Sequence, residues 1–346
     1  MGRLTAFITL SLALAACQSL TTTPVSDSIK ITPGVVVLWD SFDSFDSLAP
    51  QVTGTRTYEV IETITLSNLG PGEPEKQNLW VALISTIFPY QTVHESEISL
   101  GQFTIIQDEL GNQYAEFDLS NMGVGKEIII RIRYMISVYS IETVFTSCSG
   151  DLPEIFTQSE LHIEASNPQI QELADTLSID QGTACDQVRS FYEFIGNNLV
   201  YSYNGRNWGA QAALGEMGAD CTEFSSLMIA LSRAKGIPAR YLEGILYQDS
   251  VNPELARLEH AWLEVFFPGI GWSPVDPTLG RSSITRDDYF GKVPADRFIV
   301  TVGRNPSTLR GSSYFSHLYW PGDSTEIVNT SFDWEIKLLQ DEYSSD

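Results

Sequence analysis

The fold of this chain is decided by one stretch, Gly218-Ala219-Asp220-Cys221-Thr222-Glu223-Phe224, which predicts the start of a buried helix. Asp220 is a favourable N-cap residue, and Glu223 stands three positions later, where a carboxylate completes a capping box. Apolar residues then recur at helical spacing as far as Ala234, so one face of the helix is expected to pack inward. Gly236 suits the position after the helix end, and Pro238 prevents its continuation.

Cys221 is expected on the first turn of this helix, at the positive end of the helix dipole, where the pKa of a thiol is lowered. A lone cysteine is often only a small buried hydrophobe. Downstream, however, a predicted strand carries His260, and a Trp-Ser-Pro-Val-Asp-Pro segment carries Asp276. The order Cys, His, Asp supplies a nucleophile, a base that takes the thiol proton, and a carboxylate that orients this base.

Four motifs in this order resemble the transglutaminase-like core, a papain-like cysteine superfamily. They are Gly-x-Asp-Cys-Thr-Glu-Phe-Ser from 218, Gly-Ile-Pro-Ala-Arg from 236, His-Ala-Trp from 260 and Trp-Ser-Pro-Val-Asp-Pro-Thr from 272. The resemblance covers roughly residues 165–285. It implies an α+β fold in which a helix-borne cysteine packs on an antiparallel sheet that carries the histidine and the aspartate. It also implies Cys221 as nucleophile, His260 as general base and acid, and Asp276 as orienting carboxylate.

The same resemblance implies how the oxyanion is held. In papain-like folds the donors are the backbone N–H of the nucleophile and a side chain slightly upstream. Trp208, through its indole N–H, and Gln211, through its amide, are the two candidates. A packing or surface role fits either residue equally well.

The first residues predict targeting rather than fold. Arg3 and the apolar run 4–13 are typical of a signal peptide, and the run is too short for a membrane-spanning helix of about 20 residues. Leu-Ala-Ala-Cys at 14–17 resembles a bacterial lipobox, which implies lipid attachment at Cys17. Residues 1–17 are then a lipoprotein signal and residues 18–34 a tether, so the protein is expected outside the cytoplasm, lipid-anchored to a bacterial cell membrane. An ordinary cleaved signal peptide with an incidental cysteine is the alternative.

In such an oxidising compartment, the three cysteines other than Cys17 favour one disulfide and one free thiol. A bond between Cys148 and Cys185 is the pairing that spares Cys221. Two unpaired small hydrophobes at 148 and 185 would look the same in sequence.

Residues 35–150 indicate an all-β domain. Alternating apolar residues predict half-buried strands at 58–66 and 128–138, and the segments 79–84 and 114–119 predict two more. Their spacing and the intervening turn signals favour a small β-sandwich. Asp40, Asp43 and Asp46 recur at every third position, unlike the alternation of a calcium loop, and indicate a polar edge or turn, with a bound cation as the alternative.

Residues 151–325 are expected to form the catalytic domain. Asn167 and Pro168 predict the start of one helix, and Thr183 the start of a second. A plain four-residue hairpin at 268–271 would pair residue 267 with 272, and it leaves His260 and Asp276 offset by three positions. A bulge at Pro274 could shift this register, but spacing alone does not bring the two side chains together.

The C-terminal part is expected to wrap the catalytic domain. Its aromatic residues are candidates for the wall of a substrate cleft: Tyr314, Phe315, Tyr319 and Trp320. Residues 326–346 are expected to be a tail, frayed at its end.

The excess of acidic over basic residues limits the kinds of partner that the protein is expected to bind. The 346 residues carry 44 acidic and 20 basic side chains, a net charge of −24, so a nucleic-acid partner is not expected, because phosphate binding depends on Lys and Arg. The acidic surface fits solubility, with a cationic substrate as the narrower alternative. His94, His162 and His317 stand alone, without other residues at metal-ligand spacing, so neither a metal nor a cofactor is expected.

Together these features predict a membrane-tethered, extracytoplasmic cysteine acyl-transfer enzyme that cleaves peptide or carboxamide bonds through a thioester on Cys221. Its partner is a peptide or protein substrate, and the sequence does not indicate an oligomeric state. Hydrolysis, as in a protease or amidase, is preferred to cross-linking by analogy alone. The alternative is a non-catalytic cell-envelope binding or assembly module on the same scaffold, against which the intact Cys–His–Asp set argues.

Overall fold

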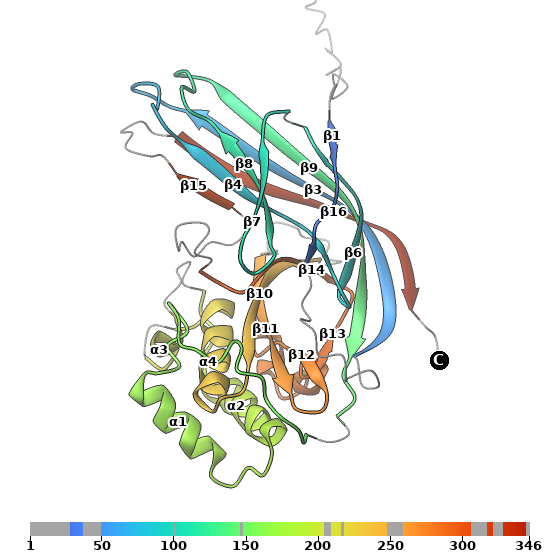
Figure 1. The fold of residues 1–346 in the computed structure, drawn as a ribbon, viewed down its shortest axis with the longest axis vertical. Coiled ribbons are helices and arrows are strands. Elements are labelled where there is room, and N and C mark those ends of the chain that lie inside the picture. The colour runs from blue at the N-terminus through green and yellow to red at the C-terminus, as the bar shows by residue number, and fades with distance from the viewer. Residues whose placement is uncertain are drawn as a thin grey trace, which may run out of the picture.

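A computed structural model describes residues 28–36, 50–99, 101–145, 148–203, 209–215, 218–247, 259–305, 317–320 and 328–343. Strands from both ends of this described chain build two sheets that face each other, and the middle of the chain builds a smaller unit of helices and strands (Figure 1). The mixed α+β fold and the β-rich N-terminal region confirm the fold class predicted from the sequence.

The larger sheet has eight strands within the described residues and runs in the order β16-β3-β9-β6-β5-β2, with β1 added to β6 and β13 to β9. Its strands are β1 (Ile29–Ile31), β2 (Val35–Val36), β3 (Gln51–Asn68), β5 (Thr86–Ile87), β6 (Gln91–Ile98), β9 (Glu127–Glu142), β13 (Lys292–Val293) and β16 (Val328–Tyr343). The predicted strands 58–66 and 128–138 lie inside β3 and β9, which pair with each other in antiparallel register.

The smaller sheet of the sandwich has the order β15-β4-β8-β7. Its strands are β4 (Asn78–Leu83), β7 (Thr104–Gln107), β8 (Gln113–Asp118) and β15 (His317–Trp320). Inward residues of both sheets, such as Val60 and Ile132 from one and Leu79 and Phe117 from the other, share one buried core. The alternation read from the sequence therefore marks the face that each sheet turns to its partner.

The predicted C-terminal tail is wrong. Most of residues 326–346 form β16, the edge strand that pairs with β3 from Val328 opposite Asn68 to Tyr343 opposite Gly54. Apolar residues at every second position, Phe332, Trp334, Ile336 and Leu338, pack against the sandwich core. This period of two is a strand signal that was present in the sequence. Residues 344–346 lie outside the described parts.

Three shorter strands also differ from the predicted boundaries. β1 lies in the predicted tether and pairs with β6, while β13 and β15, from the predicted catalytic domain, pair with β9 and β4. Strands of two to four residues carry too little periodicity to be recognised in a sequence. Of the proposed aromatic cluster, residues 319 and 320 lie on β15 in the sandwich, and residues 314 and 315 lie outside the described residues.

The helical part of the smaller unit surrounds one buried helix. The helices are α1 (Pro168–Ser178), α2 (Ala184–Asn198), α3 (Ala210–Ala213) and α4 (Cys221–Ala234), with 3-10 turns at Leu279–Arg281 and Arg286–Asp288. Asn167 caps α1 and Thr183 caps α2, as predicted. Every residue of α4 from Glu223 to Arg233 is buried, because the other three helices contact it on one side and a sheet covers the other. Burial on all sides is typical of a central core helix.

That sheet is antiparallel, with the order β12-β11-β10-β14. Its strands are β10 (Ala239–Leu246), β11 (Glu259–Phe267), β12 (Gly271–Val275) and β14 (Arg297–Val302). Ala261, Leu263 and Val265 of β11 face α4 in a shared core. Figure 1 shows the helices on one side of these strands and the sandwich above them.

The hairpin between β11 and β12 is one residue tighter than the four-residue hairpin predicted. Phe267 pairs with Gly271, and Leu263 pairs with Val275. The tight loop depends on positive φ angles at Gly269 and Gly271, +75° and +103°. A one-residue change of register reverses the faces of a strand, so Asp276 now projects on the same face as His260. Pro274 pairs in register with Glu264, so the bulge considered there is not needed.

The sandwich closes the free edge of β14 with two side-chain amides. Gln91 accepts from the Ile299 N–H (2.7 Å) and donates to the Ile299 carbonyl (2.8 Å). Asn112 makes the same pair of bonds with Val302, at 2.8 and 2.9 Å. Each amide replaces one residue of a neighbouring strand, which satisfies the backbone that an edge strand leaves open.

A buried ion pair ties the two units together. Glu264 of β11 is fully buried and accepts from Arg240 Nε (2.7 Å) and from the Tyr90 hydroxyl of the sandwich. The Arg240 guanidinium lies 4.1 Å from the ring centroid of Trp272. Glu264 is therefore shielded from solvent, because the sandwich covers this face of the sheet.

The burial of Glu264 gives a prediction for stability. Glu264→Ala leaves Arg240 buried without its carboxylate, so we expect a loss of about 3–5 kcal/mol in the free energy of unfolding, measured by urea titration. Glu59→Ala is the matched control, because Glu59 pairs with Arg133 at 2.7 Å but both side chains are partly exposed. We expect this control to lose less than about 1 kcal/mol. Equal losses in the two variants would contradict the assigned role.

Candidate functional site

The candidate nucleophile opens the buried helix. Cys221 is the first residue of α4, and the Asp220 side chain caps the helix by accepting from Thr222 N–H (3.0 Å). Glu223 accepts in return from Asp220 N–H (3.1 Å), which completes the predicted capping box. The two reciprocal bonds fix the backbone around Cys221.

Two hydrogen bonds hold this first part of α4 against the sheet. Ser225 Oγ donates to the Ala261 carbonyl (3.1 Å), and the Tyr241 hydroxyl donates to the Thr222 carbonyl (3.3 Å). The Cys221 side chain also interacts with the backbone of Ala261, the residue that follows His260. The start of α4 is thereby fixed beside the strand that carries the candidate base.

His260 and Asp276 form the second half of the site. His260 Nε2 lies 2.8 Å from Asp276 Oδ2, and both side chains are buried. The His260 ring also stacks on Trp262, with ring centroids 5.9 Å apart. Because an ionised carboxylate only accepts, Nε2 carries the proton of this bond, and Nδ1 on the other side of the ring is left to act as a base.

Asp276 is held by four hydrogen bonds. Besides His260, Oδ2 accepts from Arg297 Nη1 (2.8 Å), and Oδ1 accepts from the N–H groups of Thr278 (3.1 Å) and Leu279 (3.0 Å). Burial raises the pKa of this carboxyl, but His260, Arg297 and the Leu279 N–H together bring the pKa well below its usual range. Asp276 is therefore an ionised carboxylate at neutral pH.

Arg297 is the residue that sequence reasoning missed. It is the first residue of β14 and reaches Asp276 only because that strand pairs with β10. No motif surrounds it in the sequence, so nothing short of the strand order could have identified it.

The thiol is not activated in the way predicted. The pKa of Cys221 is raised to about 12, mainly by burial of the thiol. The Asp220 carboxylate also raises this pKa, and its effect is larger than the lowering by the Ala261 backbone. The expectation of a lowered pKa at the helix N-terminus is wrong, because the burial of the thiol dominates and the capping carboxylate adds to it by opposing the helix dipole. Cys221 keeps partial exposure, so a substrate has access to a thiol that is neutral at rest.

Three of the other predicted site residues lie within the described parts: Gln211, Cys148 and Cys185. Gln211 is at the start of α3 with an exposed side chain, and its backbone N–H donates to Glu164 Oε2 (3.1 Å). Cys148 and Cys185 form a disulfide, with Cα atoms 5.9 Å apart, and Cys221 is free. Besides residues 314 and 315, five residues named from the sequence lie outside the described parts: Trp208, Cys17, Asp40, Asp43 and Asp46.

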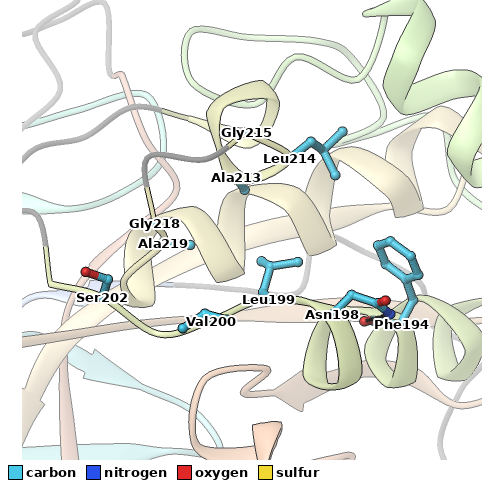
Figure 2. Close-up of a pocket in the computed structure, with 10 residues that line it drawn as sticks. All are labelled: Phe194, Asn198, Leu199, Val200, Ser202, Ala213, Leu214, Gly215, Gly218 and Ala219. Carbon is cyan, nitrogen blue, oxygen red and sulfur yellow. Dashed lines mark hydrogen bonds between the residues drawn. The ribbon is translucent and has the colours of Figure 1, made fainter.

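A cavity of about 470 Å³ borders the segment that leads into Cys221 (Figure 2). Most of its wall is apolar. It is lined by Phe194, Asn198, Leu199, Val200, Ser202, Ala213, Leu214, Gly215, Gly218 and Ala219. The wall thus includes Ala219, two residues before the candidate nucleophile, and the last turn of α2.

The described residues contain neither a metal-ligand cluster nor a membrane-spanning helix. In these parts no three His, Cys, Asp or Glu side chains gather in a way that could hold a metal ion. The helices described there include none with the length and apolar character needed to cross a membrane.

Comparison with known proteins finds a family model that matches the part of the chain around the site. Residues 171–277, which include all three candidate catalytic residues, match the transglutaminase-like superfamily, as the sequence motifs indicated. The crystal structure of a candidate cysteine protease from Cytophaga hutchinsonii superposes with a TM-score of 0.63 at 15% identity, over 84% of this chain and 93% of that chain. At that identity the similarity shows the fold.

Two further proteins are more distant or much longer. The periplasmic domain of TgpA from Pseudomonas aeruginosa has a TM-score of 0.36 at 17% identity, covering 68% of this chain and 90% of that chain. The uncharacterised protein YebA from Bacillus subtilis strain 168 is 26% identical over 217 residues. The match covers 56% of this chain but only 28% of YebA.

The raised pKa of Cys221 can be tested by alkylation. We expect the iodoacetamide rate at Cys221, followed by peptide mapping, to be still rising at pH 9, because the thiolate fraction keeps growing below a pKa of about 12. Asp220→Asn keeps a capping oxygen but removes the charge, so we expect the rate at pH 8 to rise about three- to tenfold. Asp186→Asn in the capping box of α2 is the matched control and should leave the rate unchanged. A plateau near pH 6 would contradict the raised pKa.

Proposed function

We propose that this protein, whose residues 171–277 form a transglutaminase-like domain, is a cysteine hydrolase that cleaves peptide or carboxamide bonds through a Cys221–His260–Asp276 triad. The observation that carries the proposal is the buried hydrogen bond between His260 and Asp276 beside the start of α4, where Cys221 lies. A histidine oriented by an ionised carboxylate, next to a thiol, is the arrangement that nucleophilic acyl transfer requires.

The thiol and the imidazole act in one step. Because Cys221 is protonated at rest, its proton passes to His260 Nδ1 as the sulfur attacks the carbonyl carbon. The new C–S bond gives a tetrahedral oxyanion, for which the Cys221 N–H at the start of α4 is a donor. Asp276 stabilises the imidazolium that forms.

The intermediate then collapses. The C–N bond breaks, His260 returns the proton to the leaving amine, and a thioester remains on Cys221. Water, deprotonated by His260, attacks the thioester, the C–S bond breaks, and the acid product and the thiol are released. A lysine amine in place of water would give a cross-link instead. We place hydrolysis first by analogy with the fold.

We also propose that the enzyme works outside the cytoplasm on a lipid tether at Cys17, with a peptide or protein as its substrate. The lipobox-like segment 14–17 supports the tether. The Cys148–Cys185 disulfide supports an oxidising compartment, because such bonds persist mainly outside the cytosol.

One observation favours the non-catalytic alternative. A thiol pKa of about 12 is also what a structural cysteine would show, and a cell-envelope binding module would not need the thiolate. The ionised Asp276 favours the enzyme, because burying a carboxylate only to orient a histidine is costly for a scaffold.

The experiment measures new amino termini and released ammonia from a library of peptides and glutamine-containing proteins, with incorporation of a fluorescent primary amine as the readout for cross-linking. We expect Cys221→Ala to abolish activity, and His260→Ala and Asp276→Asn to lower kcat/KM by at least about 100-fold. His94→Ala, a histidine of the sandwich that bonds Ser137, is the matched control and should retain full activity. Turnover that survives in Cys221→Ala would refute the proposal.

A further inference from the structure

The guanidinium of Arg297 binds the same carboxylate oxygen as the candidate base. Arg297 Nη1 and His260 Nε2 each lie 2.8 Å from Asp276 Oδ2, and the other oxygen is taken by two backbone N–H groups. The negative charge that favours a protonated His260 is therefore shared with a permanent cation.

Burying the Arg297 guanidinium costs desolvation free energy, and packing alone does not require a charged side chain at this position. Its side chain is 3% exposed, and its Nη2 is buried without a hydrogen-bond partner. Nε bonds Asp296 (3.0 Å), and the guanidinium carbon lies 5.3 Å from the Trp262 ring centroid and 5.7 Å from that of Tyr289. A well-packed apolar side chain would often stabilise such a site as well or better. The cation therefore points to a role at Asp276.

The sandwich fixes the position of this arginine. Arg297 begins β14, whose outer edge is bonded by Gln91 at Ile299 and by Asn112 at Val302. On the other edge β14 pairs with β10, with Arg297 opposite Leu246. The guanidinium thus starts from a strand held on both sides.

We propose that Arg297 is a positioning residue of the triad, which holds the Asp276 oxygen that faces His260 and limits how strongly this carboxylate favours the imidazolium. The inference rests on the proposed function in taking His260 as the base. An unpaired buried carboxylate would keep His260 protonated to higher pH, where it could not accept the thiol proton. With the charge shared, Asp276 attracts the imidazole proton less strongly, and the carboxylate itself stays ionised.

Other charges around the site come from several elements. The acidic groups beside the site, or on the elements packed around it, are Glu259 and Glu264 of β11, Asp220 before α4, Glu243 of β10 and Asp296 before β14. The other titratable or charged groups there are Cys221, Tyr192, Tyr289 and Arg304. Glu264 is neutralised by Arg240, and Glu243 lies 3.6 Å from Arg304. Arg297 is the cation that contacts Asp276 directly.

The test follows the titration of His260 by NMR of histidine labelled at Cε1, in the full chain with Cys221→Ala, and His260→Gln assigns its signal among the four histidines. Removing the cation in Arg297→Gln should raise the pKa of His260 by about one pH unit, because the His–Asp pair then binds its proton more tightly. Arg297→Lys keeps the charge and should shift the titration by much less.

Arg233→Gln is the matched control. Arg233 is also buried and ion-paired, but it lies at the far end of α4 and pairs with Glu160. This variant should leave the His260 titration unchanged. A folded Arg297→Gln protein, shown by its near-UV circular dichroism, whose His260 titration is unchanged or moves downward overturns the inference. If Arg297→Gln fails to fold, the Arg297→Lys protein is used instead. A His260 titration in that variant that differs from the parent by as much as one pH unit also overturns the inference. Because the titration needs no turnover, its outcome is separate from the activity of Cys221 that tests the proposed function.

Discussion

The site depends on one physical constraint, the burial of an ionised carboxylate at Asp276. A carboxylate removed from water must have its lone pairs filled, and here two side chains and two backbone N–H groups fill them. These four donors come from β11, β14 and the turn after β12, so the charge can be accommodated only when all three parts are in place. The geometry of His260 follows from this requirement.

The sandwich stabilises that geometry from outside. Amides of Gln91 and Asn112 close the edge of β14. Tyr90 bonds Glu264, which lies on the strand of His260 and pairs with Arg240 of β10. The chain enters the sandwich first, builds the transglutaminase-like unit, and returns to add β15 and β16. The β-rich part is therefore a support for the site as well as a separate layered core.

The parts that the sequence predicts are those with local signals. The capping box around Cys221 and the alternation of β3 and β9 depend on neighbouring residues, and the structure shows them where they were expected. The family resemblance added His260 and Asp276, which spacing alone left offset. In each case a few adjacent residue types decide the outcome.

The features that the sequence did not predict depend on contacts between residues that are distant along the chain. One residue fewer in the 268–270 loop places Asp276 on the face of His260, and the pairing of β14 with β10 delivers Arg297 to it. Burial of the thiol, together with the charge of the Asp220 cap, reverses the effect that the helix N-terminus was expected to have on the pKa of Cys221. The alternation of apolar residues in β16 could be recognised in the sequence, but its pairing with β3 could not, because the two strands are far apart along the chain.

In the proposed mechanism, Cys221 carries an acyl group during turnover. The most direct measurement is intact-protein mass spectrometry after acid quench, with the full chain incubated with an excess of a cleaved peptide or a peptidyl ester. We expect a thioester adduct that maps to Cys221, disappears on treatment with hydroxylamine, and does not form in His260→Ala. A substrate that is turned over without any adduct on Cys221, even when deacylation is slowed, would contradict this mechanism.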